Sequence, residues 1–310
     1  MPFITENIIL TKSFTDKVLG LRHSRSSLAS IWQILFINIA LIFPSYADEI
    51  EIYIRDDVYV DYLKFLNGRD VLSISDFTSK SIRRDVVDMI IAQQALRIGG
   101  FEHKFIYVPG KLNFRNTKML QHGKLLISFD SYWLSDASAI SSDIYISNPV
   151  IQQGEYIAGI YTSPKNKKVL SVKSIEDLST LSAVSTRKWR TDWETLRALP
   201  LKKLVEEDEW LSMARMVDIQ WIDFMLMPFN STPDQSFTLE KIALVPVKGI
   251  GVELKDSRHF VISKKHPLGA VAFKAINKGL IELRNKGAII KAYQQAGFLV
   301  DLSEITVINR

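Results

Sequence analysis

Hydrophobic and polar positions follow two periods along the chain, one of two residues and one of three to four. Charged and apolar residues alternate from Glu49 to Ile54, which is typical of a strand with one buried face. From Arg83 to Ile98 the apolar residues follow helical spacing, and Gly99-Gly100 supplies a stop. These segments predict a first strand and the helix that follows it.

The same two patterns continue towards the end of the chain. Residues 55–82 show no clear period, but strands are predicted at 104–108, 125–129, 155–161, 183–186, 203–205, 221–227 and 242–247, and helices at 113–121, 174–181, 191–199, 208–217, 270–285 and 288–296. Because strands and helices alternate, we predict an α/β fold with mainly parallel sheets flanked by helices.

A different pattern precedes residue 48. An apolar run over residues 31–43 follows Arg22 and Arg25 and ends before Pro44-Ser45-Tyr46-Ala47, which is the three-part pattern of a signal peptide. A membrane-spanning helix needs ~20 apolar residues, and this run is shorter. We therefore predict that residues 1–47 direct export to the periplasm of a Gram-negative envelope. Because the basic lead is long, the segment is either cut after Ala47 or left uncut.

Composition narrows the chemistry that the chain can perform. Of its 310 residues 47% are apolar and 24% are charged, which indicates an ordinary globular protein. The net charge is only +5, and no basic stripe is interleaved with aromatic residues, so nucleic acid is not expected as a partner. The chain has no cysteine, which excludes disulfides and thiolate chemistry. Its histidines are scattered, so we expect neither a metal site nor a cofactor.

Three groups of short motifs, taken in order, resemble one known family. They are Ile146-Ser147-Asn148-Pro149-Val150 with Gly154-Glu155-Tyr156; Ser174-Ile175-Glu176-Asp177-Leu178 with Ala183-Val184-Ser185-Thr186; and Asn277-Lys278-Gly279-Leu280 with Gly287, Tyr293 and Gly297. In this order and spacing, the chain resembles the periplasmic solute-binding proteins of the extracellular family 3 type, which bind polar amino acids for ABC importers.

The resemblance implies a two-lobed type II periplasmic-binding-protein fold. The first lobe would contain residues 48–153 plus 251–310, the second would contain residues 154–250, and two crossover strands would form the hinge. A ligand would lie between the lobes and be trapped when they close. The same position follows from the general preference of α/β sheets for ligands outside the carboxyl ends of their strands.

On this map, two groups of residues at strand ends face the cleft. The candidates for ligand binding are Asp130, Tyr132 and Trp133 of the first lobe, and Ser185, Thr186, Arg187, Trp189, Arg190 and Asn230 of the second. The alternatives are that the tryptophans are core or lobe-interface residues, and that Arg187 and Arg190 pair with Asp192 or Glu194 on a solvated helix.

Two departures from the family weaken the amino-acid interpretation. The family's carboxylate-binding arginine has no counterpart in Ser135–Ala139, and the strand after Trp221-Ile222-Asp223 runs into Pro228-Phe229-Asn230 without the family's ammonium-binding carboxylate. Neutral side chains replace a charge-assisted pair poorly. We therefore consider that Arg187 or Arg190 supplies the missing positive charge from the second lobe.

Three classes of function stay open. The first is a monomeric receptor that closes on a small polar solute and delivers it to an ABC permease or reports it to a membrane sensor. The second is a periplasmic enzyme on the same scaffold, for which Asp130 and Asp223 would be the acid and base. The third is an envelope interaction protein without a small ligand. Because no nucleophile elbow, phosphate-binding loop or zinc-binding motif is present, we predict a receptor and not an enzyme.

Overall fold

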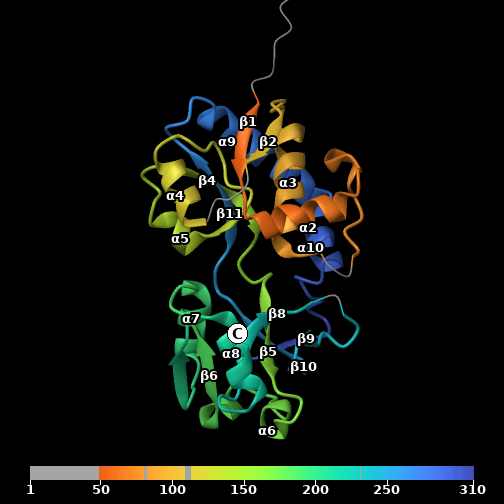
Figure 1. Ribbon diagram of the computed structural model, residues 1–310, viewed down its shortest axis with the longest axis vertical. Coiled ribbons are helices and arrows are strands. Elements are labelled where there is room, and N and C mark those ends of the chain that lie inside the picture. The colour runs from red at the N-terminus through yellow and green to blue at the C-terminus, as the bar shows by residue number, and fades with distance from the viewer. Residues whose placement is uncertain (1–48, 80–81, 109–112, 231) are drawn as a thin grey trace, which may run out of the picture. The chain divides into compact units, whose positions relative to one another are not determined.

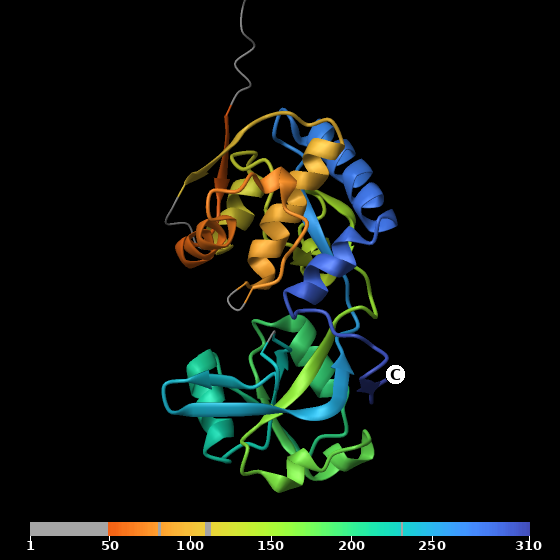
Figure 2. The same ribbon diagram turned by 90° about the vertical axis from the view of Figure 1, so that its right-hand side faces the viewer.

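The computed structural model describes residues 49–79, 82–108, 113–230 and 232–310, which form two lobes (Figures 1 and 2). The predicted signal peptide, residues 1–47, lies outside the described residues. No helix of the described part is long and apolar enough to cross a membrane.

The first lobe combines segments from the start of the described chain with segments that follow the second crossover. Its elements are β1 (Ile50–Tyr53), α2 (Asp56–Leu66), a 3-10 turn η1 (Val71–Ser73), α3 (Arg84–Ile98), β2 (Phe105–Val108), α4 (Asn113–Gln121), β3 (Tyr132–Trp133), α5 (Leu134–Ser138), β4 (Ile144–Ile151), β11 (Arg258–Ser263), α9 (Gly269–Asn285) and α10 (Ala288–Gln295). Strands β1 and β2 pair in parallel, and β11 lies between β3 and β4, antiparallel to both.

The second lobe is built mostly from one continuous stretch of chain. Its elements are β5 (Ile157–Thr162), α6 (Lys167–Leu170), a 3-10 turn η2 (Glu176–Thr180), β6 (Ser182–Ser185), α7 (Arg190–Ala198), β7 (Lys203–Glu206), α8 (Trp210–Asp218), β8 (Met225–Pro228), β9 (Phe237–Leu239), β10 (Ile242–Glu253) and β12 (Thr306–Val307). The order of its main sheet is β12-β10-β5-β8, with β9 also paired to β10. Figure 2 shows β5 and β10 side by side along this lobe.

The chain crosses between the lobes from β4 to β5 and returns from β10 to β11. The outgoing and returning passes run in opposite directions, so β10 pairs antiparallel with β5 and β11 pairs antiparallel with β4. The α/β fold is therefore as predicted, but the sheets are mixed. Among the described strands, the parallel pairing expected from the sequence occurs in β1–β2, β6–β7 and β10–β12, and the other pairs are antiparallel. Within β10, Gly249 has a φ of 72° at an irregularity in the pairing with β5, which only glycine adopts without strain.

Most predicted elements occur close to their predicted bounds, and three differ for local reasons. Residues 55–82 contain α2, whose apolar stripe consists of only two buried residues, Val58 and Tyr62. Residues 125–129 form no strand: one bridge joins Ile127 to Ile262, and the Ser128 hydroxyl then donates to the Asp130 carbonyl (2.8 Å) and turns the chain. The helix expected at 174–181 is the 3-10 turn η2.

The core of the first lobe depends on close packing of α3 against α9, which lie side by side in Figures 1 and 2. Gly99 and Gly279 allow this approach. A Cβ atom on Gly279 would lie 1.9 Å from the carbonyl oxygen of Ala95, and one on Gly99 would lie 2.0 Å from the carbonyl oxygen of Ala275. Backbone must therefore move before either position accepts a side chain.

Gly279→Ala tests this packing because two effects oppose each other. Helix propensity alone would stabilise the variant by ~1 kcal/mol. Steric overlap with Ala95 should outweigh that gain and lower the free energy of unfolding by ~2 kcal/mol or more. Urea unfolding of the purified protein measures the difference, with Lys278→Ala on the exposed face of α9 as the control. A more stable Gly279→Ala protein would contradict the packing.

Candidate functional site

A cavity of about 670 Å³ has walls from both lobes. Aromatic side chains provide much of its surface: Trp133, Tyr156, Trp189, Trp210, Phe229, Phe237 and Phe298. Charged side chains of both signs lie among them. A concave, largely aromatic cavity with a few placed polar groups is the usual form of a small-molecule site.

The first-lobe wall is anchored by the buried carboxylate of Asp88. Asp88 has no exposed surface, and it accepts hydrogen bonds from the Ser131 backbone N–H (2.9 Å) and hydroxyl (2.6 Å). The guanidinium of Arg84 and the hydroxyl of Tyr293 also donate to it. Burial alone would lower the pKa of Arg84, but the neighbouring carboxylates raise this pKa well above its ordinary value. Arg84 therefore stays charged.

Asp130 and Arg258 lie on the cavity side of this network. Asp130 accepts from Arg84 (2.9 Å), and its carboxylate lies 3.8 Å from the Arg258 guanidinium. Arg258 donates to the Ser131 hydroxyl (2.9 Å) and its guanidinium lies 4.6 Å from the centre of the Trp133 ring. Burial raises the pKa of Asp130 despite these cations. This wall is therefore a packed ionic network in which the guanidinium groups of Arg84 and Arg258 are both bound to protein groups.

The second-lobe wall carries Lys188, Trp189 and Asp192 around the start of α7. Lys188 forms an ion pair with Asp208 (2.9 Å). Asp192, in the first turn of α7, is half-buried and has no ion pair among the described residues. Burial raises the pKa of Asp192 to about 6, because the charged form loses hydration. Asp192 is therefore a carboxylate without a cation partner on the cavity wall.

A smaller cavity of about 400 Å³ adjoins the first and shares Asp130, Trp133 and Arg258 with it. Asn116, which is 3% exposed, also lines this smaller cavity. Its amide nitrogen donates to the Tyr53 carbonyl (2.9 Å), but its side-chain oxygen is buried and has no hydrogen-bond donor in the described part of the chain. A buried acceptor without a donor is uncommon in folded proteins.

Four of the residues predicted to bind ligand line the large cavity together. They are Asp130, Trp133, Trp189 and Asn230. Tyr132 lines the smaller cavity, where its hydroxyl pairs with that of Thr117 (3.0 Å). Ser185 and Thr186 are buried beneath the wall, and the Thr186 hydroxyl donates to Asp208 (2.6 Å).

The two arginines proposed to supply a missing charge are both engaged elsewhere. Arg187 donates to Glu206 (2.9 Å) and lies 5.1 Å from the Trp193 ring centre. Arg190 lies 3.7 Å from Asp136 and lines a separate cavity on the hinge side. Neither pairs with Asp192 or Glu194, as had been the alternative, because both guanidinium groups reach carboxylates outside α7.

Asp130 and Asp223, the pair considered for an enzyme, face different surroundings. Asp223 accepts from the Ser182 backbone N–H and hydroxyl, each at 2.8 Å, and it is not among the residues that line the cavity containing Asp130. Its hydrogen bonds connect β6 to the segment before β8. Asp223 therefore has a structural role, since its carboxylate holds two segments of the second lobe together.

Three residues that line the cavity were not predicted to do so from the sequence: Arg84, Asp192 and Arg258. Arg84 was visible only as a polar residue at a helix start, and Arg258 belongs to β11, which was not predicted. Asp192 was interpreted as a partner for the arginines. The available signal was that Arg84 and Asp192 lie at the starts of predicted helices, where side chains can face a cleft, whereas Arg258 lies in no predicted element.

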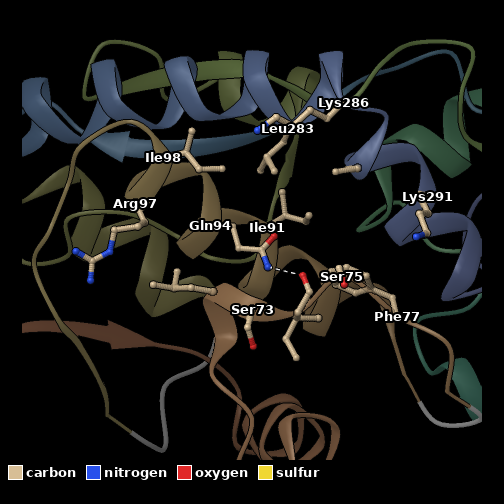
Figure 3. Close-up of a pocket in the computed structure, with 13 residues that line it drawn as sticks. Ser73, Ser75, Phe77, Ile91, Gln94, Arg97, Ile98, Leu283, Lys286 and Lys291 are labelled. Atoms are coloured by element: carbon tan, nitrogen blue, oxygen red, sulfur yellow. Dashed lines mark hydrogen bonds between the residues drawn. The ribbon is translucent and has the colours of Figure 1, made fainter.

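Another hollow, of about 390 Å³, lies in the first lobe between η1, α3 and the α9–α10 junction (Figure 3). Gln94 lies at its centre, and its amide nitrogen donates to the carbonyls of Val71 (3.0 Å) and Ile74 (2.8 Å). In Figure 3 the guanidinium of Arg97 points away from the other labelled side chains. Because Gln94 is used to hold η1 against α3, we assign this hollow to packing.

No protein-family model matches the sequence, and no curated protein matches it. Solved structures do match. The periplasmic VFT2 domain of BvgS from Bordetella pertussis is 13% identical with a TM-score of 0.53, over 86% of this chain and 97% of that one. Substrate-binding domain 2 of GlnP from Lactococcus lactis, in an open conformation, is 15% identical with a TM-score of 0.51, over 84% and 98%.

At this level of identity the similarity establishes the fold. The chain has the two-lobed fold of these solute-binding domains, which is the fold that the sequence resemblance implied. The ligand residues are a separate question, since the family's two charged contacts have no counterpart at the expected positions in this sequence.

The raised pKa of Asp192 predicts a pH-dependent stability effect. A folded-state pKa of about 6 against an ordinary value of 3.8 means that ionised Asp192 destabilises the folded state above that range. A pKa difference of about two corresponds to about 3 kcal/mol, and partial exposure should reduce the effect to ~1–2 kcal/mol.

We therefore expect Asp192→Asn to match the original protein near pH 4 and to exceed its free energy of unfolding by ~1–2 kcal/mol at pH 8. Urea unfolding at several pH values measures this, with Glu194→Gln, exposed on the same helix, as the control. Equal stabilities of Asp192→Asn and the original protein at pH 8 would show that Asp192 is not desolvated.

Proposed function

We propose that this protein is a periplasmic solute receptor that captures a small polar molecule in the cavity between its lobes. One observation carries the proposal: a cavity of about 670 Å³ has an aromatic surface and placed charges supplied by both lobes. The solute would contact Asp130, Trp133, Trp189 and Asn230. Capture and delivery need no catalytic group, which agrees with the separation of Asp130 from Asp223.

Contacts between the lobes would change as the protein opens and closes. Asp256, between β10 and β11, accepts from the Ser135 backbone N–H (3.3 Å) of α5 and from the Thr191 hydroxyl (3.2 Å) of α7. It thereby links one helix of each lobe at the hinge. A solute that binds the closed form more tightly than the open form would shift the protein towards closure.

The closed receptor would deliver its solute to an ABC permease or present it to a membrane sensor. Both uses require that a partner distinguish the closed form from the open one. The mature protein would act in the periplasm after export directed by residues 1–47. The fold supports this function because solute-binding domains of the same two-lobed design carry it out.

A thermal-shift screen of the purified protein against amino acids, amines, small organic acids and short peptides tests capture. A solute at ~100 times its dissociation constant stabilises the folded state by about 2.7 kcal/mol, which should raise Tm by roughly 5–10 °C. X-ray scattering should show a smaller radius of gyration with the same compound.

Trp189→Ala should weaken binding of that compound by about tenfold, because an aromatic wall of the cavity is lost. Trp221→Ala is the matched control, since Trp221 is 74% exposed and does not line the cavity. If the folded protein bound nothing across the whole panel, capture would be rejected in favour of a role in protein interaction.

A further inference from the structure

We infer that the captured solute is an organic cation, and that Asp192 binds its protonated nitrogen within the aromatic cavity. The inference rests on the proposed receptor function and adds the chemical class of the solute. The observation behind it is that the cations on the cavity wall have partners within the protein, whereas one carboxylate, Asp192, forms no ion pair among the described residues.

Among the described residues, every cation on the cavity wall has a partner within the protein. Arg83 pairs with Asp57 (2.8 Å), and Arg84 donates to Asp130 (2.9 Å) as well as to Asp88. Lys188 pairs with Asp208, and Arg258 is occupied by Ser131, Asp130 and the Trp133 ring. A solute carboxylate or phosphate would therefore have to displace an existing ion pair to gain a guanidinium or ammonium partner.

The carboxylates on the wall differ in this respect. Asp85 and Asp130 lie in the arginine network, and Asp136 lies 3.7 Å from Arg190. Asp192 forms no ion pair among the described residues; the charge of Arg258, which is engaged by Ser131 and Asp130, acts on it only from a distance. A half-buried carboxylate without a cation is stabilised by any positive charge brought close to it, since both charges are shielded from water there.

The surroundings of Asp192 favour a cation over an anion for a second reason. Trp189 precedes it by one helical turn and lines the same cavity, with Trp210 and Phe237 also on the second-lobe wall. The faces of aromatic rings attract cations by ~0.5–2 kcal/mol and repel anions. A protonated amine beside Asp192 would gain both interactions.

One side chain that lines the adjoining smaller cavity has an acceptor without a hydrogen-bond donor among the described residues. The side-chain oxygen of Asn116 is buried without one, whereas the amide nitrogen of the same residue is satisfied by Tyr53. An amine or guanidinium solute supplies hydrogen-bond donors, which the carboxylate of Asp192 can accept. A cationic solute that has no carboxylate needs no carboxylate-binding arginine. The absence of that arginine from Ser135–Ala139 agrees with such a solute.

Three probes with the same aromatic body separate charge from shape. Phenethylamine is a cation, phenylalanine is the zwitterion that adds a carboxylate, and 3-phenylpropionate is the anion that lacks the amine. Titration calorimetry on the full chain should give phenethylamine at least tenfold tighter binding than phenylalanine, and 3-phenylpropionate should bind weakest.

Asp192→Asn should weaken phenethylamine binding by tenfold or more, while Glu194→Gln should leave it unchanged. Loss of folding does not confuse the result, because Asp192→Asn is expected to be the more stable protein above pH 6. Equal affinity of the Asp192→Asn variant and the original protein would overturn the role of Asp192.

The two proposals fail in different ways. If 3-phenylpropionate or phenylalanine bound more tightly than phenethylamine, and Trp189→Ala abolished that binding, the receptor would stand and the cation class would fall. If another compound of the screening panel bound instead, the cation proposal would require that this compound carry a protonated nitrogen. It would also require that Asp192→Asn weaken binding of the compound by tenfold. If the folded protein bound none of these compounds, both proposals would fall.

Discussion

The rest of the first lobe depends on how the buried charge of Asp88 is satisfied. The carboxylate has no access to water, and its partners come from its own helix, from the segment before β3 and from α10. Removing one partner of a buried ion pair typically costs ~3–5 kcal/mol. Asp88 therefore holds three parts of the chain in one arrangement, and that arrangement places Asp130 and Arg258 on the cavity wall.

A consequence is that the two walls of the cavity differ in kind. The first-lobe wall is a closed ionic network whose side chains are locked before any solute arrives. The second-lobe wall presents the ring of Trp189, just before α7, and the carboxylate of Asp192 in the first turn of α7, which forms no ion pair among the described residues. In the proposed receptor, the rigid groups on one side would define the shape of the site, whereas selection of the solute's charge would depend on the other side.

Elements with strong periodicity could be predicted from the sequence, because burial of one face leaves a pattern in consecutive residues. Helix α9 and strand β1 are examples, whereas helix α3 is buried on nearly all sides. Helix α2 could not be, since it buries only Val58 and Tyr62, and the segment near Ile127 follows a serine turn instead of a strand. Local patterns also misjudged Arg187 and Arg190, whose partners Glu206 and Asp136 are distant in sequence. The cavity network was out of reach for the same reason, because no local pattern shows that Arg258 will lie against Ser131.

The same long separations constrain the order in which the chain folds. The bond from Arg258 to Ser131 spans 127 residues, and that from Tyr293 to Asp88 spans 205. The second lobe, by contrast, lies mostly between these partners in one continuous stretch. Closing long loops costs entropy that nearby contacts do not. We therefore expect the second lobe to form first. Once folded, it would hold the two segments of the first lobe close to each other.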